Sequence, residues 1–296
     1  MLDEVLKSLD VGAGDFVLDA TAGQAGHSAA ILKKQPKARL LALDADPQAV
    51  ALARETLEYF GARAEVCEAN FANIEKVLKK QKIKIINKAL FDLGWNRGQL
   101  QSGRGFSFLH DEPLVMSYGP KPLSGFTAKE IVNEWDEETL ANVFFGYGEE
   151  RYARRIAKAI VDRRKIQPIA STIELVEIIR DSVPAAYRRS RIHPATRTFQ
   201  ALRIAVNNEL GALEQGVRAV WAHLAPGGRL AVITFHSIED RAVKKLFVEF
   251  ARPPGRGARG ETIGRLIYKK PLPASQKEII TNPSARSAKL RVIEKI

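Results

Sequence analysis

A short loop with glycines follows the first apolar stretch of the chain and has the composition of a ligand-binding loop. The segment Asp19–Ser28 reads Asp-Ala-Thr-Ala-Gly-Gln-Ala-Gly-His-Ser. Gly23 and Gly26 allow a ligand to approach the backbone closely, and the helix expected after the loop offers free N–H groups. The spacing is Gly-x-x-Gly and differs from the G-x-G-x-x-G of dinucleotide enzymes. An ordinary tight turn is the alternative interpretation of the loop alone.

Two other strand-end segments carry side chains that suit an adenosine. Asp44 ends the second apolar stretch, where its carboxylate can accept hydrogen bonds from both ribose hydroxyls. Phe71 follows the third stretch and can flank an adenine ring. Since the carboxyl ends of parallel strands meet at one edge of a sheet, the three loops predict an adenosine-containing cofactor. No phosphate-binding fingerprint accompanies them, so S-adenosylmethionine fits better than NAD.

These loops need a parallel sheet to bring them together, and the first third of the chain has the pattern of one. Short apolar strands are expected at 15–19, 39–43, 64–67 and 88–93, separated by helices at about 28–34 and 47–59. This alternation predicts an α/β fold with a mostly parallel, Rossmann-like sheet.

The next convincing strand is 229–235, and the gap before it is far longer than one crossover needs. Helical patterns inside the gap cover about 137–145, 149–165 and 172–181, and one long helix is expected at 197–222. We therefore predict a catalytic domain made of residues 1–105 and 194–296, interrupted by a helical insertion at 106–193. Strands near 264–269 and 287–293 end the chain, and Ser237 with Asp240 predicts a capping box for the helix after strand 229–235.

The charge of the chain is typical of a protein that binds a polyanion. There are 46 Lys and Arg against 34 Asp and Glu, a net charge of +12. The excess lies in two zones: residues 151–203 have 13 basic and four acidic residues, and residues 252–296 have 11 and three. Composition alone leaves both nucleic acid and an anionic membrane surface open as partners.

Several classes of protein are disfavoured by the composition. No apolar run reaches the ~20 residues that a bilayer requires, and the N-terminus lacks the features of a signal peptide. Cys67 is the only cysteine, and the five histidines show no metal-ligand spacing. We expect a cytoplasmic enzyme with neither a metal nor a disulfide, and a homodimer is left open.

The first basic zone contains a helical face of a single sign. Arg151, Arg154, Arg155 and Lys158 have the spacing of one side of a helix, and further arginines follow, Arg197 among them. A solvated helix face is the alternative, but the run of like charges favours contact with RNA phosphates.

Several longer strings resemble one family, and they occur in the same order over essentially the whole chain. They include Phe91-Asp-Leu-Gly94, Tyr147-Gly-Glu-Glu-Arg151, His193-Pro-Ala-Thr-Arg-Thr-Phe-Gln-Ala-Leu-Arg203, Phe235-His-Ser-Ile-Glu-Asp-Arg241 and Arg286-Ser-Ala-Lys-Leu-Arg291. The chain closely resembles the RsmH (MraW) family by these motifs.

The resemblance implies a class I methyltransferase with a helical insertion. That family methylates the exocyclic N4 of a cytidine in the decoding region of small-subunit ribosomal RNA, so the partner would be this RNA or the 30S particle. Matching motifs place the S-adenosylmethionine contacts at Ala25, Gly26, His27, Asp44, Phe71, Asp92 and Gln99. Candidate RNA contacts within the motifs are His193, Arg197, His236 and Arg241.

Asp92 is the candidate catalytic residue because the lone pair of a cytosine N4 is delocalised into the ring. An acceptor beside the amine would offset the positive charge that develops there, although Asp92 could instead orient the cofactor. The chain departs from the family at 24–25, 95–98 and 115–118. Trp95 could stack on a flipped base or simply pack. These changes leave open a methyltransferase for another base, and an RNA-binding assembly factor without turnover is the third hypothesis.

Overall fold

The computed structural model describes residues 1–94, 97–251 and 264–296, which fold as two compact units. The first unit comprises Met1–Gly94 and Leu210–Ile296, and the second comprises Trp95–Glu209. None of the helices in the described part of the chain is long and apolar enough to cross a membrane.

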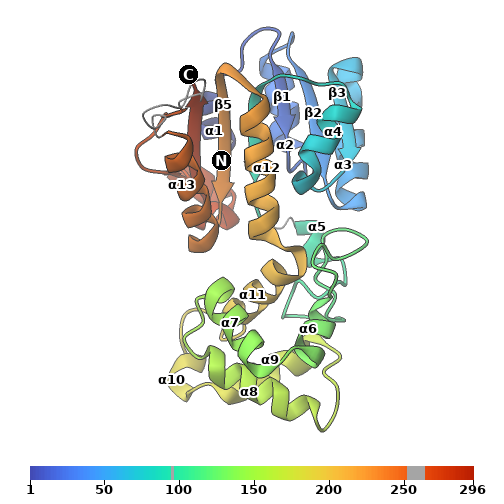
Figure 1. Ribbon diagram of the computed structural model, residues 1–296, viewed down its shortest axis with the longest axis vertical. Helices are drawn as coiled ribbons and strands as arrows, with labels where there is room; N and C mark the ends of the chain where they lie inside the picture. Colours follow the sequence, from blue (N-terminus) through green and yellow to red (C-terminus); the bar gives the residue numbers. More distant parts are fainter. Residues whose placement is uncertain (95–96, 252–263) are drawn as a thin grey trace, which may run out of the picture. The chain divides into compact units, whose positions relative to one another are not determined.

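The first unit is built on an eight-stranded sheet with the order β3-β2-β1-β4-β5-β8-β6, in which β7 also pairs with β8 (Figure 1). Its strands are β1 Phe16–Asp19, β2 Arg39–Asp44, β3 Ala64–Glu68, β4 Ile86–Asp92, β5 Leu224–Thr234, β6 Gly264–Leu266, β7 Leu272–Pro273 and β8 Lys289–Lys295. The first five strands are parallel, and β6, β7 and β8 pair antiparallel. The predicted α/β class with a mostly parallel sheet is confirmed.

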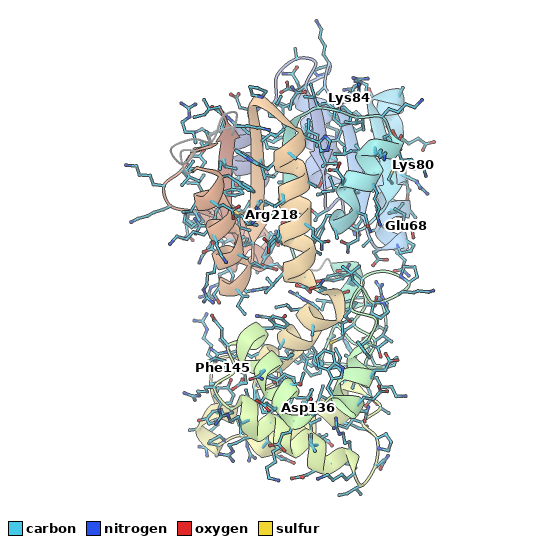
Figure 2. All side chains as sticks on the ribbon, viewed as in Figure 1. Glu68, Lys80, Lys84, Asp136, Phe145 and Arg218 are labelled. Atoms are coloured by element: carbon cyan, nitrogen blue, oxygen red, sulfur yellow. The ribbon has the colours of Figure 1, made fainter. Side chains whose placement is uncertain are left out.

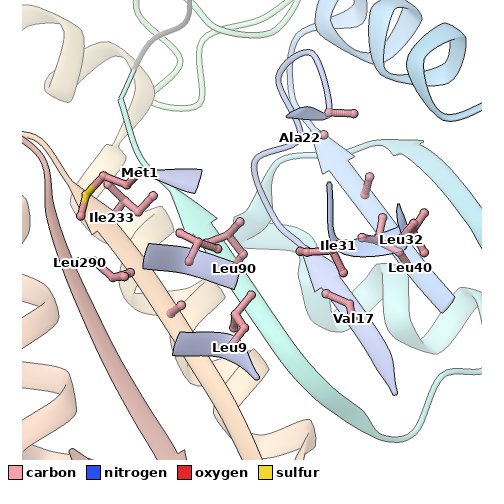
Figure 3. Close-up of a cluster of buried hydrophobic side chains, with 14 of the residues drawn as sticks. Met1, Leu9, Val17, Ala22, Ile31, Leu32, Leu40, Leu90, Ile233 and Leu290 are labelled. Carbon is pink, nitrogen blue, oxygen red and sulfur yellow. The ribbon is translucent and has the colours of Figure 1, made fainter. Parts of the chain in front are cut away.

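Successive residues of a strand point to opposite faces of the sheet. Because both faces of this sheet carry apolar side chains, both are covered by helices. Val17 and Leu90 pack in one cluster with residues of α1 and α2 (Figure 3), which also includes residues of α3. Leu18 and Phe91 pack in another cluster with α4, α12 and α13. These helices are α1 Leu2–Leu9, α2 Gly26–Lys34, α3 Pro47–Leu57, α4 Ile74–Lys80, α12 Glu209–His223 and α13 Ser237–Phe250.

The second unit is helical and has its own core. Its helices are α5 Arg97–Leu100, α6 Ala128–Glu134, α7 Glu137–Gly148, α8 Ala153–Arg164, α9 Thr172–Ser182, α10 Ala185–Arg188 and α11 Thr196–Asn207. Helices α7 and α11 approach closely at Gly148, where a Cβ would lie 2.5 Å from the carbonyl oxygen of Arg197. Because α11 packs into this core, the unit continues past the expected residue 193 to Glu209. Its other boundary is residue 95, which precedes the expected residue 106.

Three local predictions differ from the structure. The single helix expected at 197–222 is wrong: α11 ends at Asn207, and Asn208 turns the chain with a left-handed φ of 43° before α12 begins. The helix expected at 149–165 starts only at Ala153, since Glu149 takes a left-handed conformation and ends α7. The capping box of α13 was expected from Ser237 but is made one residue earlier, by His236 with Glu239, because the imidazole nitrogen accepts the N3 amide as a hydroxyl would.

Candidate active site

The loop between β1 and α2 is tied down by a buried carboxylate. Asp19 accepts hydrogen bonds from the Thr21 amide at 3.2 Å and from the Ser28 hydroxyl at 2.6 Å. Burial raises the pKa of Asp19 to about 6 despite these bonds. Sequence analysis did not select Asp19 as a site residue, although a carboxylate that ends an otherwise apolar strand was the available signal.

The glycine loop has a backbone that leaves room for a ligand. Gly23 and Ala25 have φ values of 53° and 61°, and Ala25 is the residue that precedes α2. A Cβ built at Gly23 or Gly26 would meet no atom within 4 Å. Glycine is favoured at Gly23 by its left-handed backbone, while the space beside both glycines lets another molecule approach the chain.

Asp44 lies against this loop, as the parallel arrangement of β1 and β2 predicts. Its Oδ2 accepts the Gly23 amide at 2.8 Å, and its Oδ1 accepts the Asp46 amide at 2.9 Å. Burial raises the pKa of Asp44 above its ordinary value. Each carboxylate oxygen has a second lone pair, so the half-buried group can still accept ribose hydroxyls.

Phe71 begins a short 3-10 turn, Phe71–Asn73, which is separated from the end of β3 by two residues. The Asn70 side chain starts the turn by accepting the Ala72 amide at 2.8 Å. The Phe71 ring is half-buried and meets Phe91 edge to face, with 5.7 Å between the ring centroids. It is thus held at the same end of the sheet as Asp44, where one apolar face can border a flat ligand.

Asp92 and His27 meet at the end of β4. His27 Nδ1 lies 3.5 Å from Asp92 Oδ2, and the Asp92 amide donates to the Thr21 hydroxyl at 2.6 Å. Among the described residues, His27 Nε2 and Asp92 Oδ1 are buried without a hydrogen-bond partner. A buried polar atom without a partner is costly, so these two neighbouring residues each have hydrogen-bonding capacity that the described part of the protein does not use.

The same burial changes how both groups titrate. Burial, and next the charge of Asp19, raises the pKa of Asp92 to about 7. Burial lowers the pKa of His27 to about 4, so the imidazole is neutral at physiological pH. The pair therefore combines a neutral imidazole with a carboxyl group that exchanges its proton near neutrality, which suits proton transfer.

A cavity of about 240 Å³ opens beside this pair. All of its lining residues belong to the first unit: Met1, Leu2, Gly26, His27, Asp92, Ile233, Phe235, Glu278, Asn282, Ala285 and Ala288. The last four come from the C-terminal segment, which the sequence had not linked to the site. The cavity thus joins the glycine loop, the end of β4 and the chain's last residues.

Gln99 is not among the residues that the first unit brings together. It lies in the four-residue helix α5 of the second unit, where it is buried. Trp95 lies outside the described residues.

The predicted RNA-binding cations of the second unit are exposed, but they differ in how firmly they are held. The Arg151 guanidinium lies 4.8 Å from the ring centroids of both Tyr152 and Tyr187. Lys158 forms an ion pair of 2.7 Å with Asp162. Arg151 precedes α8, whereas Arg154, Arg155 and Lys158 lie on its exposed side, so the predicted face is only partly helical.

The remaining candidates divide between the two units. In the second unit His193 stacks on Phe108 at 4.7 Å, and Arg197 donates to the Glu149 carbonyl at 3.0 Å. In the first unit His236 caps α13, while Arg241 is exposed one turn further along that helix. His236 therefore has a structural role whether or not it contacts a substrate.

Comparison with known proteins decides the family. The model of the MraW methylase family matches residues 1–296. The chain belongs to this family. It is 47% identical to the ribosomal RNA small subunit methyltransferase H of Heliobacterium modesticaldum and 45% identical to that of Heliobacterium mobile, in each case over all of this chain and 97% of the relative. The equivalent protein of Brevibacillus brevis is 43% identical over all of this chain and 96% of its own length. The predicted family and the predicted methyltransferase class are confirmed.

Proposed function

We propose that this methylase methylates the N4 amine of a cytidine in the decoding region of 16S ribosomal RNA, with Asp92 at the reacting centre. S-adenosylmethionine is the methyl donor, and small-subunit ribosomal RNA is the substrate. The observation that carries the proposal is the cavity lined by His27 and Asp92, each of which also has one buried polar atom without a hydrogen-bond partner among the described residues, Nε2 and Oδ1. It lies beside a glycine loop whose outer side is open.

The donor fits the residues at the carboxyl end of the sheet. The glycine loop allows close approach at Gly23 and Gly26, Asp44 has free lone pairs for the two ribose hydroxyls, and Phe71 offers a ring edge or face to the adenine. When bound, S-adenosylmethionine supplies a methyl group activated by a cationic sulfur. Its charge favours the carboxylate form of Asp92, whose pKa is about 7 in its absence.

Asp92 then has two tasks at the N4 amine. As a carboxylate it accepts a hydrogen bond from the amine, which holds the nitrogen in position and favours the loss of its conjugation with the ring. Transfer of the methyl group, with cleavage of its bond to the sulfonium sulfur, would leave the nitrogen positively charged, and the Asp92 carboxylate would then take the proton that the nitrogen loses. His27, which contacts the other oxygen of Asp92 at 3.5 Å, keeps the carboxylate oriented.

The helical second unit binds RNA through its exposed cations in this proposal. Its segment 151–203 carries 13 basic and four acidic residues. The exposed Arg151, Arg154 and Arg155 and the half-buried Arg197 would contact phosphates, which position a substrate without reading its sequence. The enzyme would meet its substrate in the cytoplasm, as free RNA or as the 30S particle, and either as a monomer or as a homodimer.

Nucleoside mass spectrometry tests the function directly. The protein is incubated with labelled S-adenosylmethionine and either free small-subunit RNA or 30S particles that lack the modification, and the RNA is then digested. We expect labelled N4-methylcytidine, with Asp92→Asn as the matched control that forms it much more slowly. A different methylated nucleoside would show that the residues at 95–98 and 115–118 redirect the enzyme. No label in either substrate would contradict the proposal.

A further inference from the structure

The C-terminal segment Ala285–Lys289 borders the Asp92 cavity and alternates small and cationic residues. It leaves the 3-10 turn Pro283–Ser287 and enters β8. Ala285 and Ala288 are buried and line the cavity, whereas Arg286 and Lys289 are exposed. The two alanines thus form part of the cavity wall, and the two cationic side chains are exposed to solvent next to that wall.

The register of the sheet fixes where these cations lie. Asp92 pairs with Ile233 across β4 and β5, and Ile233 and Thr234 pair with Leu290 and Lys289 across β5 and β8. Lys289 on β8 therefore lies at the same edge of the sheet as Asp92 on β4, with β5 between them. Neighbouring strands are ~5 Å apart, so the lysine is within reach of a nucleotide held at Asp92.

The charge of these two residues is little used within the protein. Arg286 has no ion pair among the residues that the structure describes, and Lys289 Nζ lies 3.6 Å from Asp240 Oδ2. Asp240 already holds Arg291 through two hydrogen bonds of 2.7 and 3.1 Å, and the Lys289 side chain is 47% exposed. One carboxylate thus faces two cations, which leaves Lys289 available to a second anion.

The acidic residue Glu278, which also lines the cavity, does not neutralise the positive charge of Arg286 and Lys289. It is paired with the Met1 ammonium at 3.0 Å. Hydrogen bonds from that ammonium and from Asn282 lower the pKa of Glu278, although burial acts in the opposite direction. Its charge is therefore compensated locally.

We propose that Arg286 and Lys289 bind the RNA phosphates next to the target nucleotide, at the mouth of the Asp92 cavity. The inference rests on the proposed function and adds to it a second RNA contact, on the catalytic unit itself. A phosphate contact beside the reacting base would fix how far the base enters the cavity. The cations of the second unit would add affinity through phosphates elsewhere in the RNA.

The test compares Arg286→Gln/Lys289→Gln with a control that loses the same charge elsewhere on the first unit. Lys80→Gln/Lys84→Gln is suitable because both lysines are exposed. Glu68 ends β3 and so marks the carboxyl end of the parallel strands, and Lys84 lies toward the opposite end of the sheet (Figure 2). Affinity for small-subunit RNA is measured from 0.05 to 0.5 M salt, together with S-adenosylmethionine affinity and single-turnover methylation.

Each lost phosphate contact lowers the slope of log affinity against log salt concentration by about 0.7–0.9. If the affinities are equal at 1 M salt, this is a loss of about five- to eightfold in affinity at 0.1 M salt for each contact. We expect Arg286→Gln/Lys289→Gln to lose about 25- to 60-fold in RNA affinity at 0.1 M salt, with unchanged affinity for the methyl donor. The charge-conserving Arg286→Lys/Lys289→Arg should keep the slope, which separates lost charge from lost folding.

An affinity and slope equal to those of the lysine control would overturn this inference, and normal methylation in the same experiment would leave the proposed function standing. Loss of slope in the charge-conserving variant would also overturn it, since the effect would then come from a disturbed cavity wall. Failure of the wild-type protein to methylate small-subunit RNA would instead reject the proposed function.

Discussion

Replacing Asp92 with asparagine removes a charge that the fold buries at a cost. The pKa of Asp92 is raised from 3.8 to about 7, first by burial and then by the charge of Asp19. An acid whose pKa is higher in the folded state holds its proton longer there than in the unfolded chain. Its contribution to the free energy of unfolding is therefore least unfavourable at low pH and worsens as the pH rises from 3.8 through 7.

The size of this effect follows from the two pKa values. At ~1.4 kcal/mol for each pH unit between them, the ionised side chain costs the fold up to about 4 kcal/mol at pH 8. Asp92→Asn is uncharged at every pH, although its amide, like the carboxyl group, lacks a partner among the described residues for the atom at the Oδ1 position. We expect the variant to be more stable than wild type by about 2–4 kcal/mol at pH 8 and by about 1–2 kcal/mol at pH 5.

Urea denaturation at the two pH values, without the methyl donor, measures both numbers. Asp240→Asn is a matched control of opposite sign, because Arg291 lowers the pKa of Asp240 in spite of its burial. Removing that carboxylate should destabilise the protein at pH 8. If Asp92→Asn shows no gain that grows with pH, the charge of Asp92 is not buried in solution.

The same variant tests the chemistry. Single-turnover methylation at saturating donor should be about 10²–10³ slower, since an amide can neither offset the developing charge nor take the proton. In the wild type the rate should rise with pH as Asp92 ionises, with a midpoint at or below 7 because the cationic donor favours the carboxylate. A rate within a few-fold of wild type would limit Asp92 to orienting the donor.

Three further variants test other parts of the molecule. Asp44→Ala should weaken S-adenosylmethionine binding by about 1–3 kcal/mol in calorimetry, and unchanged affinity in a folded variant would reject its contact with the ribose. Arg154→Glu/Arg155→Glu should weaken RNA binding and lower the salt slope by about 0.7–0.9 for each lost contact, with normal donor binding; an unchanged slope would make that face merely solvated. Tyr187→Phe should lower the free energy of unfolding by about 1–2 kcal/mol in urea, because the buried Glu150 carboxylate loses the hydroxyl that donates to it at 2.6 Å. A value equal to wild type would show that water replaces that hydroxyl.

Local patterns were sufficient for much of the fold. The apolar runs and their spacing predicted β1 to β5. The reason holds best for β1, β2, β4 and β5, since a buried parallel strand must be apolar on both faces, whereas β3 lies at the edge of the sheet. The same patterns failed where they fit one continuous helix as well as two helices with a break between them. The apolar periodicity continues through Asn208, so nothing in it marks the break between α11 and α12. The break is stabilised by Asn207, whose side-chain amide donates to the distant Met116 carbonyl at 2.8 Å.

The sequence by itself determined which residues are available for chemistry, because parallel strands place their carboxyl ends at one edge. Asp44 and Asp92 end such strands, and Phe71 follows one. Only the tertiary structure decided how they are used. The contact of His27 with Asp92, and the cavity wall that Ala285 and Ala288 supply from the far end of the chain, depend on strand order and register. No local pattern encodes them, since burial and pairing with distant residues are properties of the assembled sheet.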